Sequence, residues 1–316
     1  MTTLTIYSPS GAVKQAAALR RALKHLQRMG FVASLDETAL SREQRFAGSD
    51  DERLAAIHRV ARSGVDVALA SRGGYGMTRL LDRLDWRLIA KAIANGQRWV
   101  GQSDLTAFQL GLLAHVPGCG PTWAGPLAVA DFGRTAAEGG VDEITEACFD
   151  EAVHGELEAI GFRQVGLPRG QQPQDGLERE GLLWGGNLSM ICSLLGTPHW
   201  PAVRGGILFV EEVGEHPYRI ERMLLQLHQA GVLDAQQAVL VGELSGWKPA
   251  AHDRGYKLTD ALDAVRQQTR TPIIQGLPHG HGATKVCLPV GVPAALSVQG
   301  RDVMLAWGHL EGGQGQ

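Results

Sequence analysis

The sequence has little of what would point to a membrane, a nucleic acid or a disulfide framework. None of its four cysteines forms a CxxC pair, and scattered cysteines in a chain of 316 residues are more typical of buried thiols than of disulfides or a zinc site. No run of about 18 apolar residues occurs, so no membrane-spanning helix is expected. The net charge is −3 and lysine and arginine form no cluster, which argues against nucleic acid as a partner.

The N-terminal segment also lacks the pattern of a signal peptide. "MTTLTIYSPSG" has no basic stretch followed by a long apolar one, so we expect no signal peptide and a soluble, cytoplasmic protein. Hydrophobic residues make up 44% of the chain and charged residues 20%, which is enough apolar material for a sizeable core. The length suggests one large or two ordinary domains.

The first half of the chain alternates strand and helix signals. Ser49 and Glu52 have the spacing of a capping box that opens a helix. This alternation predicts a largely parallel sheet covered by helices. Strands are expected over 4–8, 31–35, 65–71 and 98–103, and helices over 14–30, 51–64, 77–84 and 86–96.

The second half repeats the alternation after a stretch that is harder to assign. Residues 117–126 and 167–176 are rich in glycine, proline and glutamine and are predicted to be loops. We therefore expect an N-terminal domain over 1–160, a linker over 161–180 and a C-terminal domain over 181–316. In the latter, strands are expected over 205–215, 238–244 and 272–277, helices over 218–231 and 257–269, and a β-rich tail over 285–307.

Ser103 and Asp104 stand where a predicted strand becomes a helix, in "GQSDLT" (101–106). Ligands of open α/β sheets bind at this edge, and the free N–H groups of a helix start suit a developing oxyanion. The turn is not the GxSxG elbow of α/β-hydrolases, because Leu105 occupies the last glycine position. From this segment alone, a simple helix cap by Ser103 or Asp104 is the favoured interpretation.

Other strand ends carry glycines, acids and bases. "SRGGYG" (71–76) could bring backbone close to a ligand or make a tight turn. Glu211 and Glu212 end an apolar strand, where a carboxylate needs a partner or solvent. His279 and His281 lie in a glycine-rich loop, as a base, as half of a metal site, or as ordinary loop residues. Serine, glutamate and histidine at strand ends are the parts of a hydrolase triad.

At these residues the chain resembles the L,D-carboxypeptidase family of serine peptidases, the muramoyltetrapeptide carboxypeptidases. The similarity runs in order along most of the chain. It rests on "SPSG" (8–11), "SRGGYG" (71–76), "GQSDLT" (101–106), "GGNLSMICSLLGT" (185–197), "ILFVEEVGEHPYRIERML" (207–224) and "GHGATKVCLPVG" (280–291).

The resemblance implies a triad of Ser103 as nucleophile, Glu211 as acid and His281 as base. His279 stands where many members have an aromatic residue, and Glu212 where the family often has Asp. The oxyanion would be held by backbone N–H groups of Asp104 and of Gly73 or Gly74. No cofactor and no metal are expected.

The resemblance also implies a fold, a substrate and an assembly. The fold would be α/β, with an N-terminal Rossmann-like or flavodoxin-like domain and a smaller, β-rich α/β C-terminal domain. The activity would be release of terminal D-alanine from murein tetrapeptides in peptidoglycan recycling, by a cytoplasmic homodimer. Arg72, Lys285 and the N–H groups after Ser103 are candidates for reading the substrate carboxylate, and a structural ion pair is expected for Arg219 and Arg222.

Three alternatives stay open. A microcin C immunity-type serine peptidase would share the fold and cleave a peptidyl or aminoacyl nucleotide. Trp247 could then stack on the base, although packing is the plainer role. A metal-dependent hydrolase would use His279, His281 and a glutamate, and a non-catalytic protein would bind a sugar or peptide without cleaving it.

Overall fold

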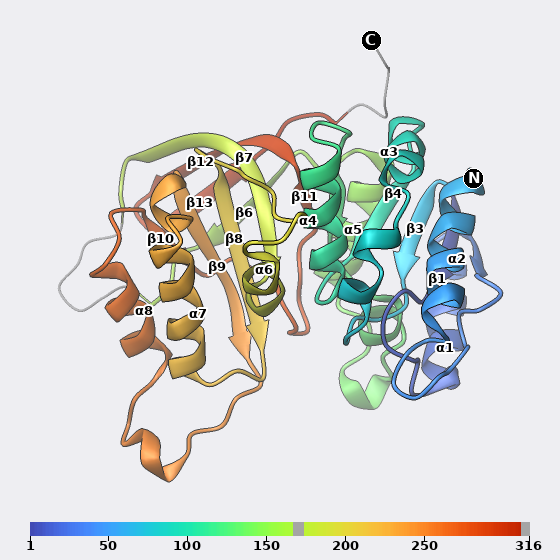
Figure 1. The fold of residues 1–316 in the computed structure, drawn as a ribbon, viewed down its shortest axis with the longest axis horizontal. Helices are drawn as coiled ribbons and strands as arrows, with labels where there is room; N and C mark the ends of the chain where they lie inside the picture. The colour runs from blue at the N-terminus through green and yellow to red at the C-terminus, as the bar shows by residue number, and fades with distance from the viewer. Residues whose placement is uncertain (167–173, 311–316) are drawn as a thin grey trace.

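The computed structural model describes residues 1–166 and 174–310, which build two sheets side by side (Figure 1). The first sheet has the order β2-β1-β3-β4-β5-β11 and is parallel except for β11. The parallel order 2-1-3-4-5 is that of flavodoxin-like folds. Its strands are β1 (Thr3–Tyr7), β2 (Val32–Leu35), β3 (Val67–Ala70), β4 (Arg98–Gly101), β5 (Thr122–Ala124) and β11 (Leu288–Val290).

Helices connect the parallel strands of the first sheet. In α2, Ser49 and Glu52 form the expected capping box, with Ser49 Oγ accepting the N–H of Glu52. The segment 77–84, expected to be helical, is instead two short 3₁₀ turns, η1 (Met77–Arg79) and η2 (Leu81–Arg83). The helices are α1 (Ala16–Arg28), α2 (Asp50–Arg62), α3 (Trp86–Ala94), α4 (Leu105–His115) and α5 (Glu143–His154), and the π-helical turn η3 (Ala128–Phe132) packs against α1.

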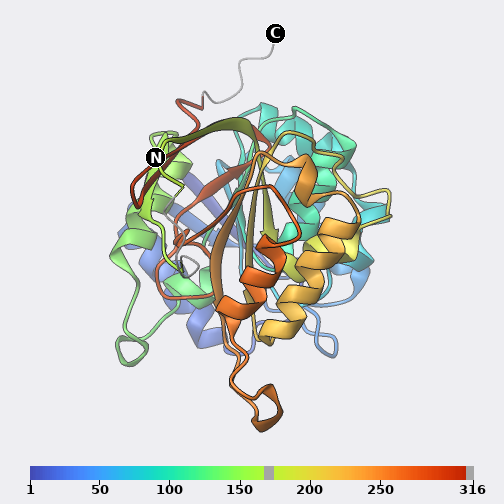
Figure 2. The same cartoon turned by 90° about the vertical axis from the view of Figure 1, so that its left-hand side faces the viewer.

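The second sheet is mixed, with the order β10-β9-β8-β7-β12-β13-β6. The strands from β7 to β10 are parallel, whereas β12, β13 and β6 pair antiparallel. Its elements are β6 (Ala159–Arg163), β7 (Leu177–Asn187), α6 (Leu188–Leu194), β8 (Ile207–Val213), α7 (Pro217–Gln229), β9 (Ala238–Ser245), α8 (Leu258–Arg266), β10 (Ile273–Gln275), β12 (Val292–Gln299) and β13 (Asp302–Ala306). Helices α7 and α8 lie together on one face of it (Figures 1 and 2).

The two sheets exchange strands. β6 follows directly after α5 but pairs with β13 in the second sheet, and β11 follows β10 of the second sheet but pairs with β5 in the first. The expected linker over 161–180 thus overlaps the end of β6 and the start of β7, while 167–173 lie outside the described residues. Part of the segment 117–126, expected to be a loop, is β5.

The contact between the two halves runs through α4. Thr106 Oγ1, in the first turn of α4, accepts a 2.9 Å hydrogen bond from the N–H of Asn187 at the end of β7. A Cβ at Gly186 would come 2.4 Å from the same Oγ1, so this glycine permits the close approach. In Figure 1, the arrowheads of β3, β8 and β9 point to the same side of the molecule. None of the helices in the described part of the chain combines the length and apolar character needed to span a membrane.

Candidate active site

Ser103 sits on a strained turn between β4 and α4. Its φ is +65°, and among the described residues only Gln44 and Arg254 are other non-glycine residues with positive φ. Such a conformation is unfavourable for a residue with a Cβ and is often found at functional sites. A Cβ at Gly101 would come 2.5 Å from Leu105 Cδ2, so the tight turn requires glycine before the serine. The turn thus has the character of a nucleophile elbow although it lacks the GxSxG pattern.

The glycine loop after β3 lies against this turn. A Cβ placed at Gly73 would come 2.7 Å from Ser103 Oγ and 3.3 Å from the backbone N of Asp104. The loop is held from the other side, because the N–H of Gly11 donates to the carbonyl of Gly73 at 3.2 Å. Within residues 1–166 and 174–310, the N–H groups of Gly73, Gly74 and Asp104 donate to no other residue. The two segments that meet at the serine, the glycine loop at Gly73 and the start of α4 at Asp104, therefore each carry backbone N–H groups without a partner among the described residues.

The side chain of Asp104 has a structural contact. Its Oδ2 accepts the N–H of Met77 at 2.8 Å, which joins the start of α4 to the loop after β3. Burial raises the pKa of the Asp104 carboxyl, against the opposing effects of the Met77 N–H and the positive charge of Arg53. The side chain thus stabilises the turn, while the backbone N–H of the same residue has no acceptor among the described residues and can donate to a ligand.

Glu211 and His281 are brought together across the second sheet. Glu211 lies in the buried part of β8, and its Oε2 lies 2.7 Å from Nδ1 of His281 in the loop after β10. Burial opposes the charged imidazolium, but the hydrogen bond and negative charge of Glu211 outweigh it and raise the pKa of His281. The carboxylate thus fixes the tautomer with hydrogen on Nδ1 and leaves Nε2 as the basic atom.

Glu212 has a different role from its neighbour. It is buried and accepts from Asn187 Nδ2 at 3.0 Å and from the N–H of Ser189 at 2.8 Å. Burial raises the pKa of this carboxyl, with the hydrogen bonds acting in the opposite direction. Because Asn187 also contacts Thr106, Glu212 connects the end of β8 to the helix that follows Ser103.

The two histidines of the loop turn to different partners. His279 is buried, its Nδ1 donates to the carbonyl of Val286 at 3.0 Å, and its ring packs edge-on against Phe209. Burial lowers the pKa of His279. Since Nδ1 of His281 faces Glu211, the two rings do not form a shared ligand pair, and the described residues contain no group of three or more His, Cys, Asp or Glu side chains arranged to hold a metal ion.

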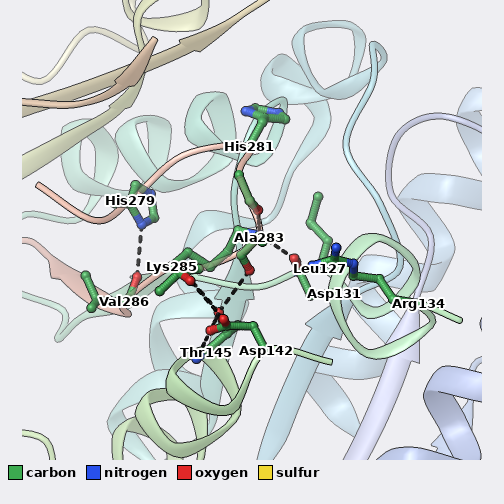
Figure 3. A network of polar contacts seen from close by, with 12 residues as sticks. Leu127, Asp131, Arg134, Asp142, Thr145, His279, His281, Ala283, Lys285 and Val286 are labelled. Carbon is green, nitrogen blue, oxygen red and sulfur yellow. Dashed lines mark hydrogen bonds and ion pairs between the residues drawn. The ribbon is translucent and has the colours of Figure 1, made fainter. Parts of the chain in front are cut away.

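A cavity of about 520 Å³ opens beside His281. Gln102, the residue before Ser103, and His281 both line it, so the serine turn and the imidazole border the same space. No hydrogen bond joins Ser103 Oγ to His281 within the described part of the chain. Figure 3 shows the inner wall of the cavity, where the buried Nζ of Lys285 contacts Asp131. Lys285 Nζ also donates to the carbonyl of Gly282 at 3.0 Å, which holds the loop next to His281.

Asp131 and Arg134 line the cavity but escaped sequence analysis. Asp131 lies in η3 and Arg134 follows it, in a segment with no clear helix or strand pattern and no local motif. The only signal was indirect, because a lysine in the glycine-rich loop would need an acidic partner if it became buried. That partner comes from the distant first half of the chain, which sequence spacing does not reveal.

Other residues singled out by sequence lie outside this arrangement. Arg72 is partly buried and donates from Nη1 to the carbonyl of Ala12 at 2.8 Å. Arg219 forms a 2.5 Å ion pair with Glu215, as expected, whereas Arg222 is exposed and has no ion pair to a described residue. Trp247 is partly buried beside the ring of His216 and does not line the cavity beside His281.

Comparison with known proteins places this geometry in a family. Residues 4–121 match the LD-carboxypeptidase N-terminal domain, and residues 180–296 match the LD-carboxypeptidase C-terminal domain. A putative carboxypeptidase of Streptomyces coelicolor is 33% identical, over 93% of this chain and 89% of the relative. The chain belongs to the LD-carboxypeptidase family. It is therefore a member of a serine peptidase family, and the expected α/β fold, with a mostly parallel first sheet and a mixed second sheet, is confirmed.

Two further LD-carboxypeptidase relatives carry more specific names. A probable murein peptide carboxypeptidase of Bacillus subtilis is 30% identical over 93% of this chain and 88% of its own. The crystal structure of muramoyltetrapeptide carboxypeptidase from Oxalobacter formigenes is 37% identical, with a TM-score of 0.85 over 97% of this chain and 99% of that one. The microcin C7 self-immunity protein shares the fold, with a TM-score of 0.83 at 22% identity.

Proposed function

We propose that this LD-carboxypeptidase releases terminal D-alanine from murein tetrapeptides. The observation that carries the proposal is the 2.7 Å contact between Glu211 and His281, on a cavity that the serine turn also borders. A histidine held by a buried carboxylate is the general base that a weak serine nucleophile needs. The names of the relatives from Bacillus subtilis and Oxalobacter formigenes support the murein peptide as substrate.

In the first half of the reaction, Ser103 Oγ attacks the carbonyl carbon of the bond that precedes D-alanine. A bond forms between Oγ and this carbon, and the hydroxyl proton moves to Nε2 of His281. Glu211 accepts the Nδ1–H and stabilises the imidazolium. The hydrogen bond between Ser103 and His281 would form on substrate binding, as catalytic hydrogen bonds commonly tighten only in the complex.

The negative charge that develops on the carbonyl oxygen is assigned to backbone donors. The N–H of Asp104 and that of Gly73 or Gly74 lie beside the serine, and each such donor typically contributes about 3–4 kcal/mol to the transition state. The carbon–nitrogen bond then breaks as His281 returns the proton to the amine of D-alanine. Water, deprotonated by His281, hydrolyses the acyl-enzyme, and the proton returns to Ser103.

The test is incubation with a murein tetrapeptide and measurement of free D-alanine by mass spectrometry. Wild-type protein should release D-alanine and tripeptide, and Ser103→Ala should release almost none while still binding the tetrapeptide. Unchanged activity in the presence of a chelator would separate this mechanism from a metal-dependent one. Binding without cleavage by the wild-type protein would instead indicate a non-catalytic binding protein.

A second candidate function is a microcin C immunity-type peptidase that cleaves a peptidyl or aminoacyl nucleotide. The specific observation in its favour is the segment 246–257 between β9 and α8, which extends from the carboxyl edge of the second sheet and carries Trp247 (Figures 1 and 2). Release of an amino acid from an aminoacyl sulfamoyl nucleoside, but not from a tetrapeptide, would favour this function.

We further propose that the enzyme acts as a cytoplasmic homodimer in peptidoglycan recycling, with a nucleophile-bearing first domain and a second domain that carries the acid and base.

A further inference from the structure

The cavity beside His281 contains more positive charge than its own acids neutralise. Lys14, Arg21 and Arg134 line it, and none of them has a carboxylate within 4.0 Å in the described part of the chain. The acidic side chains that line the same space are already engaged. Asp131 contacts Lys285, and Glu138 accepts from its own turn, at 2.8 Å from the N–H and from Oγ1 of Thr135.

Two of these cations are held in place by backbone carbonyls. Arg21 donates from Nε to the carbonyl of Gly133 at 2.8 Å, and Arg134 donates from Nη2 to the carbonyl of Glu138. Each guanidinium keeps further N–H donors for a ligand, in a planar fork that matches a carboxylate. Because the carbonyls already restrain the side chains, less conformational freedom is lost when a ligand binds.

The chemistry of the proposed reaction fixes which part of the substrate lies near this charge. His281 returns a proton to the departing amine, so the amine nitrogen must lie within about 3 Å of Nε2. The carboxylate of a terminal amino acid is separated from its own nitrogen by a single carbon. The departing residue must therefore occupy the space next to His281, and this space is the cavity with the three cations.

We propose that this cavity is the site of the departing D-amino acid and that Arg134 reads its free carboxylate. Arg21 and Lys14 supply further positive charge, and the substrate class is a peptide with an unblocked, anionic C-terminus. The inference rests on the proposed function. It explains why the enzyme would act as an exopeptidase, since a peptide bond continuing beyond the departing residue would replace the carboxylate by a neutral amide and leave the cations unpaired. Arg72 and Lys285 are not assigned this role, because Arg72 does not line the cavity and Asp131 neutralises Lys285.

The experiment compares two substrates, the tetrapeptide with a free C-terminal carboxylate and the same peptide with a C-terminal amide. Wild-type enzyme should prefer the free acid in kcat/KM by about 100-fold or more, as a charge-assisted two-pronged contact would give. Arg134→Ala should lose most of this preference, because its kcat/KM on the free acid should fall much further than its kcat/KM on the amide. Arg134→Lys should keep part of it, because lysine retains the charge without the fork.

The matched control is Arg20→Ala, which removes an exposed arginine next to Arg21 on α1 that does not line the cavity. This variant should keep the full preference for the free acid. A second measurement uses D-alanine and D-alaninamide as competitive inhibitors, which reports binding in this site even for a slow variant. D-Alanine should inhibit the wild type better than D-alaninamide, and the difference should vanish in Arg134→Ala.

The two hypotheses fail in different ways. If the wild type releases no D-alanine from the tetrapeptide, the proposed function is wrong. If the wild type releases D-alanine but Arg134→Ala retains the full preference for the free acid, the function stands and the assignment of Arg134 is overturned. Equal kcat/KM of the wild type on acid and amide would also overturn it.

Discussion

Nδ1 of His281 lies 2.7 Å from Oε2 of Glu211, although Glu211 belongs to strand β8 and His281 to the loop between β10 and β11. The carboxylate is buried and the imidazole borders the cavity, so the pair links the protein interior to the substrate space. In the proposed mechanism this contact sets the protonation state of His281, and it leads to the first prediction.

Glu211→Gln should change both the rate and its pH dependence. Glu211 raises the pKa of His281, so the acidic limb of kcat/KM in the wild type should have its midpoint above the ordinary histidine value of about 6.5. Glutamine removes the charge, so the midpoint should move to lower pH and kcat should fall by about 10³–10⁴-fold. A pH–rate profile measures both effects, with the exposed Glu180→Gln as control, and an unmoved midpoint would contradict the assignment of His281 as base.

Two substitutions of Ser103 should have the same effect on catalysis but different effects on stability. Ser103→Ala and Ser103→Gly should both abolish D-alanine release, but glycine adopts a φ of +65° without the steric cost that alanine retains. We expect Ser103→Gly to be more stable than Ser103→Ala by about 0.5–1 kcal/mol in the free energy of unfolding. Urea denaturation measures the difference, and equal stability would show that the turn is not strained.

Gly73→Ala should impair catalysis with a small effect on folding. The added methyl group would come 2.7 Å from Ser103 Oγ, so either the hydroxyl or the glycine loop must move. Displacement of one oxyanion donor should lower kcat by about 10²–10³-fold. Gly161→Ala is the control, because its nearest neighbour would lie 3.7 Å away. Wild-type kcat in Gly73→Ala would exclude this loop from the oxyanion site.

Loss of Lys285 should destabilise the protein more than loss of the whole ion pair. Lys285 and Asp131 are both almost fully buried, so Lys285→Met leaves an unpaired carboxylate in the interior and should cost about 3–5 kcal/mol of unfolding free energy. In the double variant Asp131→Asn with Lys285→Met, the amide oxygen can still accept the N–H of Leu127, which now donates to Asp131 at 2.7 Å. Chemical denaturation should therefore show a smaller loss for the double variant. A larger loss there would mean that the charge pair itself is stabilising.

Local sequence patterns predict the elements whose partners are close in the chain. The alternation of strands and helices from β1 to α4 and from β8 to β10 follows from apolar periodicity and from caps such as Ser49. The strand β5 was missed because it has only three residues within a stretch rich in glycine and proline, and β6 was missed because its partner is a strand that begins at Asp302. Periodicity within a few residues contains no information about such partners.

The same limit applies to the site. Ser103, Glu211 and His281 stand in recognisable segments at strand ends, and the structure brings the last two into contact. Asp131 and Arg134 have no such segment, and their position depends on how η3 packs against α1. Chemical groups that lie in motifs could thus be predicted, whereas the residues that shape the cavity could not.

The short strand β11 has a consequence for how the protein can be divided. It follows the loop with His281 and completes the edge of the first sheet beside β5. A fragment that ends near residue 160 would therefore expose β5 as a bare edge, which promotes aggregation, and it would also cut through β6, whose partner β13 lies in the other fragment. Expression of the two halves as separate polypeptides should give poorly soluble products. Co-expression should improve solubility, because β6 can then pair with β13 and β11 with β5.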